Sequence, residues 1–206
     1  MKPERIPLFP LEVVLFPAAS LPLHIFEPRY KLMIERCLAH QLEFGVVLAR
    51  PQGIVRVGCT AAILEVVKKY EDGQMDILTL GRNPFRVKDV MEDQAYLEGA
   101  VEYLEDAQSP SSREIEEQLL GLYQQCHKLL FHRDPETRDT RQATSLAYQI
   151  AGELPLDLGF KQELLELRAE AERQTHLLER LNQWLPHLNY LDRMRGKAGG
   201  NGHGTP

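Results

Sequence analysis

Cysteine and histidine side chains come closest together at Cys126-His127, with His132 five residues further along the chain. Adjacent residues on a helix point about 100° apart, and residues five apart also lie on different faces. Metal ligands have to converge, as side chains at i and i+4 do. The spacing therefore predicts no metal site, and Cys126 is expected to be a small buried hydrophobe on an apolar stripe.

Nucleophilic and phosphate-binding chemistry also lack their usual sequence context. A serine nucleophile sits on a tight turn between small residues, whereas Ser20 and the serines of 109–112 fit caps or a linker and Ser145 falls inside an expected helix. The sequence contains no Gly-x-x-x-x-Gly-Lys-Ser/Thr segment, so its backbone offers no phosphate loop of that kind. We therefore expect a protein that is not an enzyme and that needs no cofactor.

Carboxylates are numerous in the first half of the chain. Asp and Glu are rarely buried, so these side chains are expected on the solvated faces of strands. Examples are Glu65, Asp72, Asp76, Glu98 and Glu102.

Apolar and aromatic residues, held between prolines, are the remaining candidates for function. Residues 6–11 contain three aliphatic side chains, an aromatic ring and two prolines. Prolines preorganise a loop and remove backbone donors. Most such side chains fill a core, and any that stay exposed would form a protein-binding patch. The predicted patch comprises Phe9, Pro10, Phe16, Pro22, Phe26 and Phe85, with Arg82 and Arg86 at its rim.

Short strands are expected to position these residues. The apolar runs are short, several alternate with period two, and Asp72-Gly73 between two of them predicts a hairpin turn. One helix interrupts the strands from Pro28, because Tyr30, Met33, Ile34, Cys37 and Leu38 fall on one helical face. The strands are predicted at Val13–Phe16, Leu21–Phe26, Phe44–Ala49, Ala62–Tyr70, Met75–Leu80, Phe85–Val90 and Tyr96–Leu104.

Helical periodicity replaces the strand pattern after a linker at 109–112. Ser111 with Glu114 predicts a capping box at the start of a long helix. Three further helices are expected at Thr140–Gly152, at Lys161–Leu167 and around Leu177–Leu185, the last ending at Pro186. The sequence thus predicts a β-rich part over residues 1–108, a helical bundle over 109–195 and a disordered tail over 196–206.

Composition narrows the class of protein further. The net charge is −6, which argues against nucleic acid as a partner, because such binding draws on clustered Lys and Arg. The sequence contains no apolar run of the roughly 18 residues that a membrane helix needs. Three widely spaced cysteines and the lack of a secretory signal predict a protein of the reducing cytoplasm.

The order of residues in several segments resembles the amino-terminal substrate-binding domain of Lon proteases. The resemblance runs from Ile6-Pro-Leu-Phe-Pro-Leu through Leu21-Pro-Leu-His-Ile-Phe-Glu-Pro-Arg-Tyr30, Leu80-Gly-Arg-Asn-Pro-Phe-Arg-Val87 and Ala151-Gly-Glu-Leu-Pro-Leu-Asp. It implies an α+β fold in which a PUA-like antiparallel β pseudo-barrel with one inserted helix precedes an all-α bundle. It also implies a module that binds unfolded or tagged polypeptide, or another protein partner, and has no catalytic part.

Two other functions stay open from the sequence. A PUA-like protein could bind RNA, although the acidic balance counts against it. The chain could also be an accessory subunit that regulates an ATP-dependent protease. Neither the partner nor the oligomeric state follows from the residues, and a weak homodimer is compatible with them.

Overall fold

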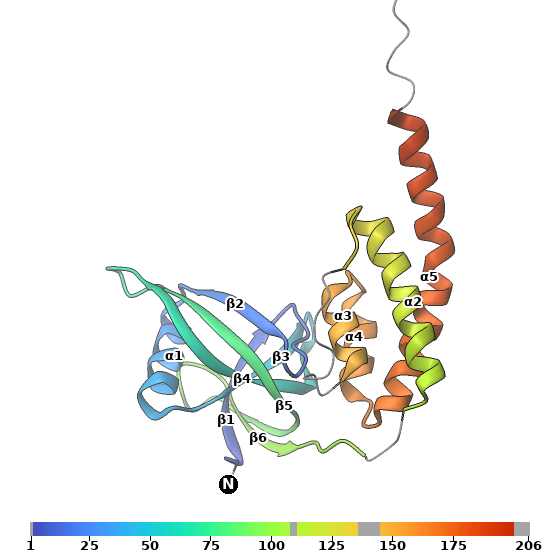
Figure 1. Ribbon diagram of the computed structural model, residues 1–206. Helices are drawn as coiled ribbons and strands as arrows, with labels where there is room; N and C mark the ends of the chain where they lie inside the picture. Colours follow the sequence, from blue (N-terminus) through green and yellow to red (C-terminus); the bar gives the residue numbers. More distant parts are fainter. Residues whose placement is uncertain (1, 108–110, 136–144, 200–206) are drawn as a thin grey trace, which may run out of the picture.

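The computed structural model describes residues 2–107, 111–135 and 145–199 (Figure 1). Six strands and one helix form a β half, and four further helices form a helical half. Among the described residues, no helix is both long enough and apolar enough to span a bilayer. The elements in chain order are β1 (Arg5–Leu11), β2 (Ser20–Ile25), α1 (Pro28–His40), β3 (Phe44–Arg50), β4 (Gly53–Lys69), β5 (Met75–Met91), β6 (Glu98–Tyr103), α2 (Arg113–Phe131), α3 (Leu146–Glu153), α4 (Leu158–Glu166) and α5 (Glu170–Gly199).

The six strands form a single mixed sheet that closes on itself. The order is β2-β5-β4-β3-β1-β6, and β5 also pairs with β6. Strand β5 is long enough to do both, because residues 75–80 pair with β2 and residues 85–91 pair with β6. The β1–β3 pair is parallel and the others are antiparallel, so the prediction of a wholly antiparallel arrangement was wrong for this pair. Helix α1 lies between β2 and β3 and provides the long connection that a parallel pair requires.

The core is continuous from the β half into the helical half. One cluster of buried residues includes Met33 and Ile34 of α1 as well as Leu164 of α4 and Leu177 of α5. A smaller cluster packs around Phe85. The strands approach so closely there that a Cβ atom at Gly58 would lie 2.4 Å from a backbone oxygen.

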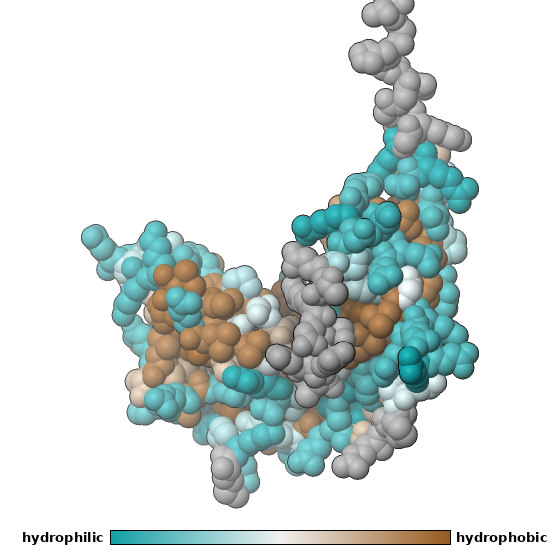
Figure 2. All heavy atoms as spheres, in the orientation of Figure 1, coloured by the Kyte–Doolittle hydropathy of each residue, from teal (hydrophilic) through white to brown (hydrophobic). Residues whose placement is uncertain are grey.

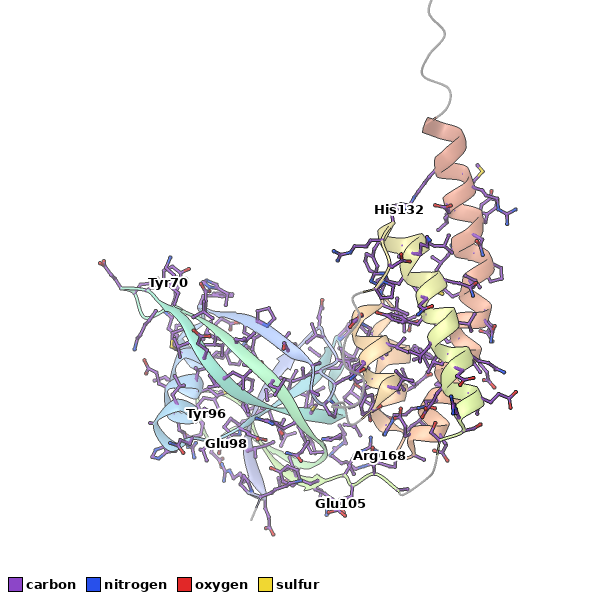
Figure 3. The ribbon with its side chains drawn as sticks, viewed as in Figure 1. Tyr70, Tyr96, Glu98, Glu105, His132 and Arg168 are labelled. Atoms are coloured by element: carbon purple, nitrogen blue, oxygen red, sulfur yellow. The ribbon has the colours of Figure 1, made fainter. Side chains whose placement is uncertain are left out.

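Several contacts join the helical half to the β half. The rings of Phe16 and Tyr148 stack with their centroids 4.9 Å apart. The side-chain amide of Gln162 in α4 donates a hydrogen bond to the carbonyl of Val57 in β4 over 3.0 Å. Arg168 lies at the junction of the two halves in Figure 3 and forms an ion pair with Asp106, with 3.6 Å between nitrogen and oxygen. Helix α5 then runs on beyond the other helices (Figure 1).

Most of the predicted elements are present. Helix α1 begins at Pro28 as predicted and buries Tyr30, Met33, Ile34 and Cys37 of the expected apolar face, whereas Leu38 is exposed. The Asp72-Gly73 turn joins β4 to β5, and Gly73 has a positive φ of 80°, a value that side chains with a Cβ disfavour. In contrast, Val13–Phe16 is not a strand; β1 is formed instead by the preceding residues 5–11.

Four details of the helical half differ from the prediction. The cap of α2 is Ser112, while the Ser111 hydroxyl contacts Gln174, so the predicted capping box is wrong. Ser145 caps α3 instead of lying inside a helix. Helix α5 continues through Pro186, because buried leucines on either side hold it against the rest of the protein. It reaches Gly199, past the predicted start of the tail at 196. Two predictions lie outside the described residues: the boundary at 108–109 and the first residues of the helix predicted at 140–152.

Candidate functional site

Three aromatic residues of the predicted patch are core residues. Phe9, Phe16 and Phe85 are 6%, 1% and 0% exposed. Phe9 packs on Tyr30 of α1, with ring centroids 4.1 Å apart, and Phe85 fills the space left by the close-packed glycines. These three side chains cannot contact a partner in this conformation, so their assignment to a surface patch is corrected.

The other predicted residues lie at the surface but not together. Pro22 and Phe26 are exposed at β2, and Pro10 is half-buried in β1. Arg82 and Arg86 are exposed on β5. Since Pro22 pairs with Leu78, Arg86 lies eight residues further along β5, or about 25 Å at the rise of an extended strand. The structure therefore separates the arginines from Phe26.

A different apolar surface surrounds Phe26. The register aligns Pro22, Leu78 and Glu65 across β2, β5 and β4, and then aligns His24, Asp76 and Lys68. Residues directly opposite each other in a sheet point to the same face, and Met75 and Ile77, which alternate with Asp76 and Leu78, are buried. The aligned rows therefore face outward. We call this surface the outer β-face, and its members are Pro22, His24, Phe26, Leu64, Val67 and Leu78.

Two bulges bring additional apolar side chains to the outer β-face. The register between β4 and β5 shifts between Ile63 and Glu65 and again between Val66 and Lys68. The extra residues at these shifts are Leu64 and Val67, which are 50% and 61% exposed. Phe26 is 57% exposed. In Figure 2, hydrophobic atoms gather on the visible face of the β half and again along the helices.

Sequence reasoning missed Leu64 and Val67 because it assumed regular alternation. In 62–70 the apolar residues exceed what one buried face of a strand can take. That excess was the available signal, because apolar and polar residues should alternate in a strand with one solvent-exposed face. It can mean either a strand buried on both sides or a bulge, and only the register distinguishes them.

A polar network lies at the hairpin end of the outer β-face. The Nδ1 of His24 is 2.6 Å from an Asp76 oxygen, and the hydroxyl of Tyr70 donates to the other Asp76 oxygen over 2.8 Å. The hydrogen bond with His24, followed by that from Tyr70, holds the pKa of Asp76 below its usual value. Figure 3 places Tyr70 near the tip of the hairpin. The network fixes the ring of His24, which stacks against Phe26 with centroids 6.0 Å apart.

Both ring nitrogens of His24 have side-chain partners. Its Nε2 is 3.0 Å from the side-chain oxygen of Gln74, whose amide nitrogen donates to Asp72 over 2.6 Å. Within the described part of the chain, no serine or cysteine forms a hydrogen bond with His24. The network thus orders the side chains at this end of the outer β-face.

Buried thiols and scattered carboxylates complete the inventory of reactive groups. Burial raises the pKa of Cys37 and of Cys126 to about 11, and it also raises the pKa of Cys59. Such thiols are poor nucleophiles at neutral pH. Across residues 2–107, 111–135 and 145–199, no group of three or more His, Cys, Asp or Glu side chains is placed to hold a metal ion.

One carboxylate expected at the surface is buried. Glu98 is 3% exposed and forms ion pairs with Arg5 and with Arg36, the latter over 2.7 Å. Arg36 also donates to the hydroxyl of Tyr96 over 2.9 Å, and Figure 3 shows Tyr96 and Glu98 near each other in the β half. Glu98 therefore ties β1, α1 and β6 together and is a structural residue.

Comparison with known proteins gives one consistent family. The model of the ATP-dependent protease La (LON) substrate-binding domain matches residues 5–183. The Lon protease of Escherichia coli (strain K12) is 26% identical over 221 residues, which cover 96% of this chain and 28% of that protein. The Lon protease of Cytophaga hutchinsonii is 24% identical over 198 residues, and the match covers 88% of this chain and 24% of that protein. The chain thus spans about a quarter of the length of these relatives.

Two solved structures have the same fold. The crystal structure of a Lon N-terminal domain protein from Xanthomonas campestris aligns with a TM-score of 0.64 at 25% identity, covering 88% of this chain and 99% of that one. The N-terminal domain of Mycobacterium avium complex Lon protease aligns with a TM-score of 0.61 at 17% identity, covering 86% and 98%. The α+β arrangement of the sheet and helices is therefore one that solved Lon N-terminal domains share.

Proposed function

The chain belongs to the family of the LON substrate-binding domain, and on that premise we propose that it binds segments of unfolded polypeptide without catalysing a reaction. The outer β-face is the proposed binding surface. The proposal places the protein in the cytoplasm, in keeping with three unpaired, buried cysteines. It also assigns the closed β half to the PUA-like class that the sequence predicts.

The observation that carries the proposal is the exposure of three large apolar side chains on one face. Phe26, Leu64 and Val67 are each at least half exposed. Phe26 directly follows β2, and Leu64 and Val67 are the residues left unpaired where the register between β4 and β5 shifts. Covering a Val or Leu side chain is worth roughly 1.5–3 kcal/mol. Exposed apolar side chains that gather on one face are typical of a binding surface.

The geometry favours contacts through side chains over the addition of a strand. Strand β2 pairs with β5 alone among the described strands, so its other edge is free. Pro22 interrupts that edge, since proline has no N–H to donate. A bound polypeptide would therefore be recognised by the apolar character of its side chains. Such recognition suits unfolded segments of many sequences.

The polar network reduces the cost of binding. His24 is held by Asp76 and Gln74, so the ring against which Phe26 stacks is fixed before a partner arrives. A surface that is ordered in advance loses less conformational entropy when it binds. Of the residues predicted from the sequence, Pro22 and Phe26 belong to this surface. Pro10, Arg82 and Arg86 are not members of the outer β-face, and they remain candidate contacts for a polypeptide that extends beyond it.

A pair of aspartate substitutions tests the proposal. Leu64→Asp with Val67→Asp should weaken the binding of fluorescein-labelled, reduced and carboxymethylated α-lactalbumin at least about tenfold, since two apolar contacts are lost. The melting temperature should stay nearly unchanged, because both side chains are exposed. Leu191→Asp with Met194→Asp, which makes the same two-charge change at exposed sites on α5, is the matched control.

Two results would contradict the proposal. One is equal affinity of the unfolded probe for the wild-type chain and the double variant. The other is an equal loss of affinity in the control on α5, which would show that the added charge acts at any site. Fluorescence anisotropy at 0.15 M salt, the ionic strength at which charges beyond roughly 8 Å are screened, distinguishes these results.

A further inference from the structure

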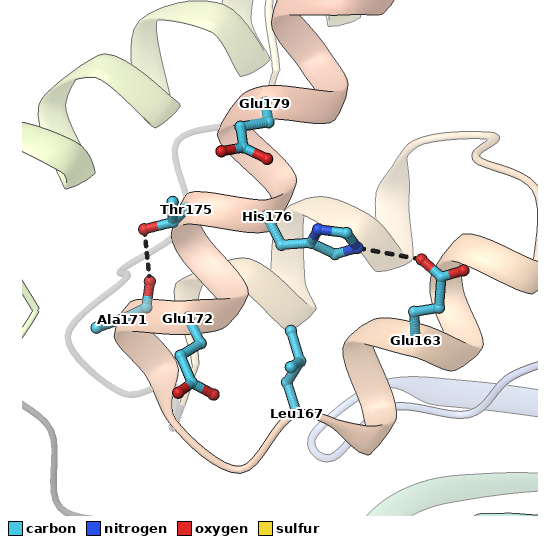
Figure 4. A pocket seen from close by; sticks show the side chains of 7 residues that line it. All are labelled: Glu163, Leu167, Ala171, Glu172, Thr175, His176 and Glu179. Atoms are coloured by element: carbon cyan, nitrogen blue, oxygen red, sulfur yellow. Dashed lines mark hydrogen bonds and ion pairs between the residues drawn. The ribbon is translucent and has the colours of Figure 1, made fainter.

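A second concave surface lies in the helical half, between α4 and the first turns of α5. Its volume is about 780 Å³, within the range of roughly 300–1,000 Å³ typical of ligand sites. Figure 4 shows Glu172 and Glu179 one above the other on α5, with Glu163 reaching across from α4. We call it the α4–α5 groove, and it is lined by Glu163, Leu167, Ala171, Glu172, Thr175, His176 and Glu179.

The centre of the α4–α5 groove is apolar. Leu167 and Ala171 supply aliphatic surface. The Thr175 hydroxyl donates to the carbonyl of Ala171 over 2.9 Å and is thereby occupied. His176 forms one wall, since its ring stacks on Phe160 with centroids 4.8 Å apart. This surface suits an aliphatic side chain of a partner.

Negative charge dominates the rim of the groove. Glu163 is paired with His176 at 3.1 Å. No ion pair of Glu172 or Glu179 is found within the described ranges. The two lie seven residues apart, so they share one face of α5.

The nearby arginines do not neutralise this rim. Arg173 is buried and bonded to Asp106, and Arg180 is paired with Asp157. The unbalanced carboxylates therefore remain available to positive charges from outside the chain. Such charges would be drawn to the groove by its field.

We propose that the α4–α5 groove binds a cationic amphipathic peptide segment of a partner protein. One or two aliphatic side chains of the segment cover Leu167 and Ala171, and Lys or Arg side chains on either side meet Glu172 and Glu179. The combination of an apolar centre and a charged rim is how protein interfaces are commonly built. A metal ion fits less well, since no metal-holding cluster occurs among the residues that the structure describes.

The inference is independent of the function proposed for the outer β-face. That face selects apolar side chains and carries no net excess of carboxylates among its members. The groove selects positive charge beside an apolar residue. Binding to the groove should therefore weaken as salt rises, whereas binding to the outer β-face should depend on salt much less.

The test uses the full chain and a fluorescein-labelled twelve-residue peptide in which two leucines lie between lysines and arginines. Wild-type protein should bind it measurably at 50 mM salt and not bind the same peptide with glutamates in place of its basic residues. Glu172→Gln with Glu179→Gln should weaken binding roughly tenfold, the equivalent of two lost rim charges. Glu35→Gln with Glu92→Gln removes the same net charge from exposed sites on the β half and should leave the affinity unchanged.

A second variant blocks the groove sterically without changing its charge. Ala171→Trp should also abolish binding of the cationic peptide while leaving binding of an unfolded apolar polypeptide intact. Four results would overturn the proposal: no binding of the cationic peptide, equal binding of the acidic peptide, equal loss in both glutamine pairs, or full binding by Ala171→Trp. Binding of the unfolded polypeptide by the outer β-face variants tests the proposed function separately: loss of that binding supports it, and unchanged binding contradicts it without affecting the groove.

Discussion

Arg173 is completely buried in α5 and links the helical half to the segment that leaves the β half. Its guanidinium forms ion pairs with Asp106 and with Glu170, the latter over 2.9 Å. It also donates to the hydroxyl of Tyr148 and to the carbonyl of Leu167, each over 3.0 Å. Burial alone would lower the pKa of Arg173, but the hydrogen bonds to Asp106 and Glu170 outweigh it and raise the pKa above its ordinary value.

Arg173→Ala should therefore destabilise the protein strongly. Removing one partner of a buried pair costs about 3–5 kcal/mol. Asp106 is 43% exposed and can be hydrated again, while Glu170 keeps a hydrogen bond from the backbone of Ala147 at 3.1 Å. These two compensations favour the lower end, about 3 kcal/mol, which lowers the melting temperature by roughly 6–12 °C for a chain of this size.

Urea unfolding followed by circular dichroism measures this loss. Arg180→Ala is the matched control, because its ion pair with Asp157 is exposed at both partners and should contribute about 0–1 kcal/mol. Arg173→Lys should lie between the two, since lysine keeps the charge but cannot reach all partners at once. If Arg173→Ala lost no more free energy than Arg180→Ala, the reasoning about a buried ionic joint would be refuted.

Three further predictions concern stability. Glu98→Gln should cost about 1–3 kcal/mol in urea unfolding, because it leaves two arginines without their buried carboxylate; an unchanged midpoint would contradict this. Gly81→Ala should lower the melting temperature, since the new Cβ would lie 2.1 Å from a backbone oxygen, whereas Gly121→Ala, with nothing within 4 Å, should raise it slightly. Since burial raises the pKa of Cys37 and Cys126 from 9.0 to about 11, their contribution to stability is complete below pH 9 and is lost as pH rises toward 11. The urea midpoint of the wild-type protein should therefore fall between pH 8 and pH 10 by more than that of the variant with both cysteines replaced by alanine. An equal fall in the two proteins would contradict this explanation.

Local rules were sufficient for the elements whose signals are short-range. Helix α1 follows from the spacing of its apolar residues and from Pro28, and the hairpin follows from Asp72-Gly73. Both depend on neighbours within a few positions. The identity of the family also followed from the order of residues in the opening segments, and the match over 5–183 confirms it.

Which side chains are buried or exposed depends on strand and helix contacts between distant parts of the chain, which the sequence alone did not predict. The burial of Phe9 and Phe85 depends on α1 and on close-packed glycines from other strands. The burial of Glu98 depends on arginines more than sixty residues away in the chain. The exposure of Val67 depends on a register shift between β4 and β5 that alternation in one strand cannot reveal.

Site-specific photo-crosslinking tests the central claim most directly, because it reports what touches the outer β-face. The photoreactive residue p-benzoylphenylalanine is placed at Val67, and in a second protein at Met194, which is also about half exposed. After irradiation with reduced and carboxymethylated α-lactalbumin, the outer β-face claim predicts crosslinked product from position 67 and little from position 194. Crosslinking of equal yield at both positions, or none at position 67, would contradict it.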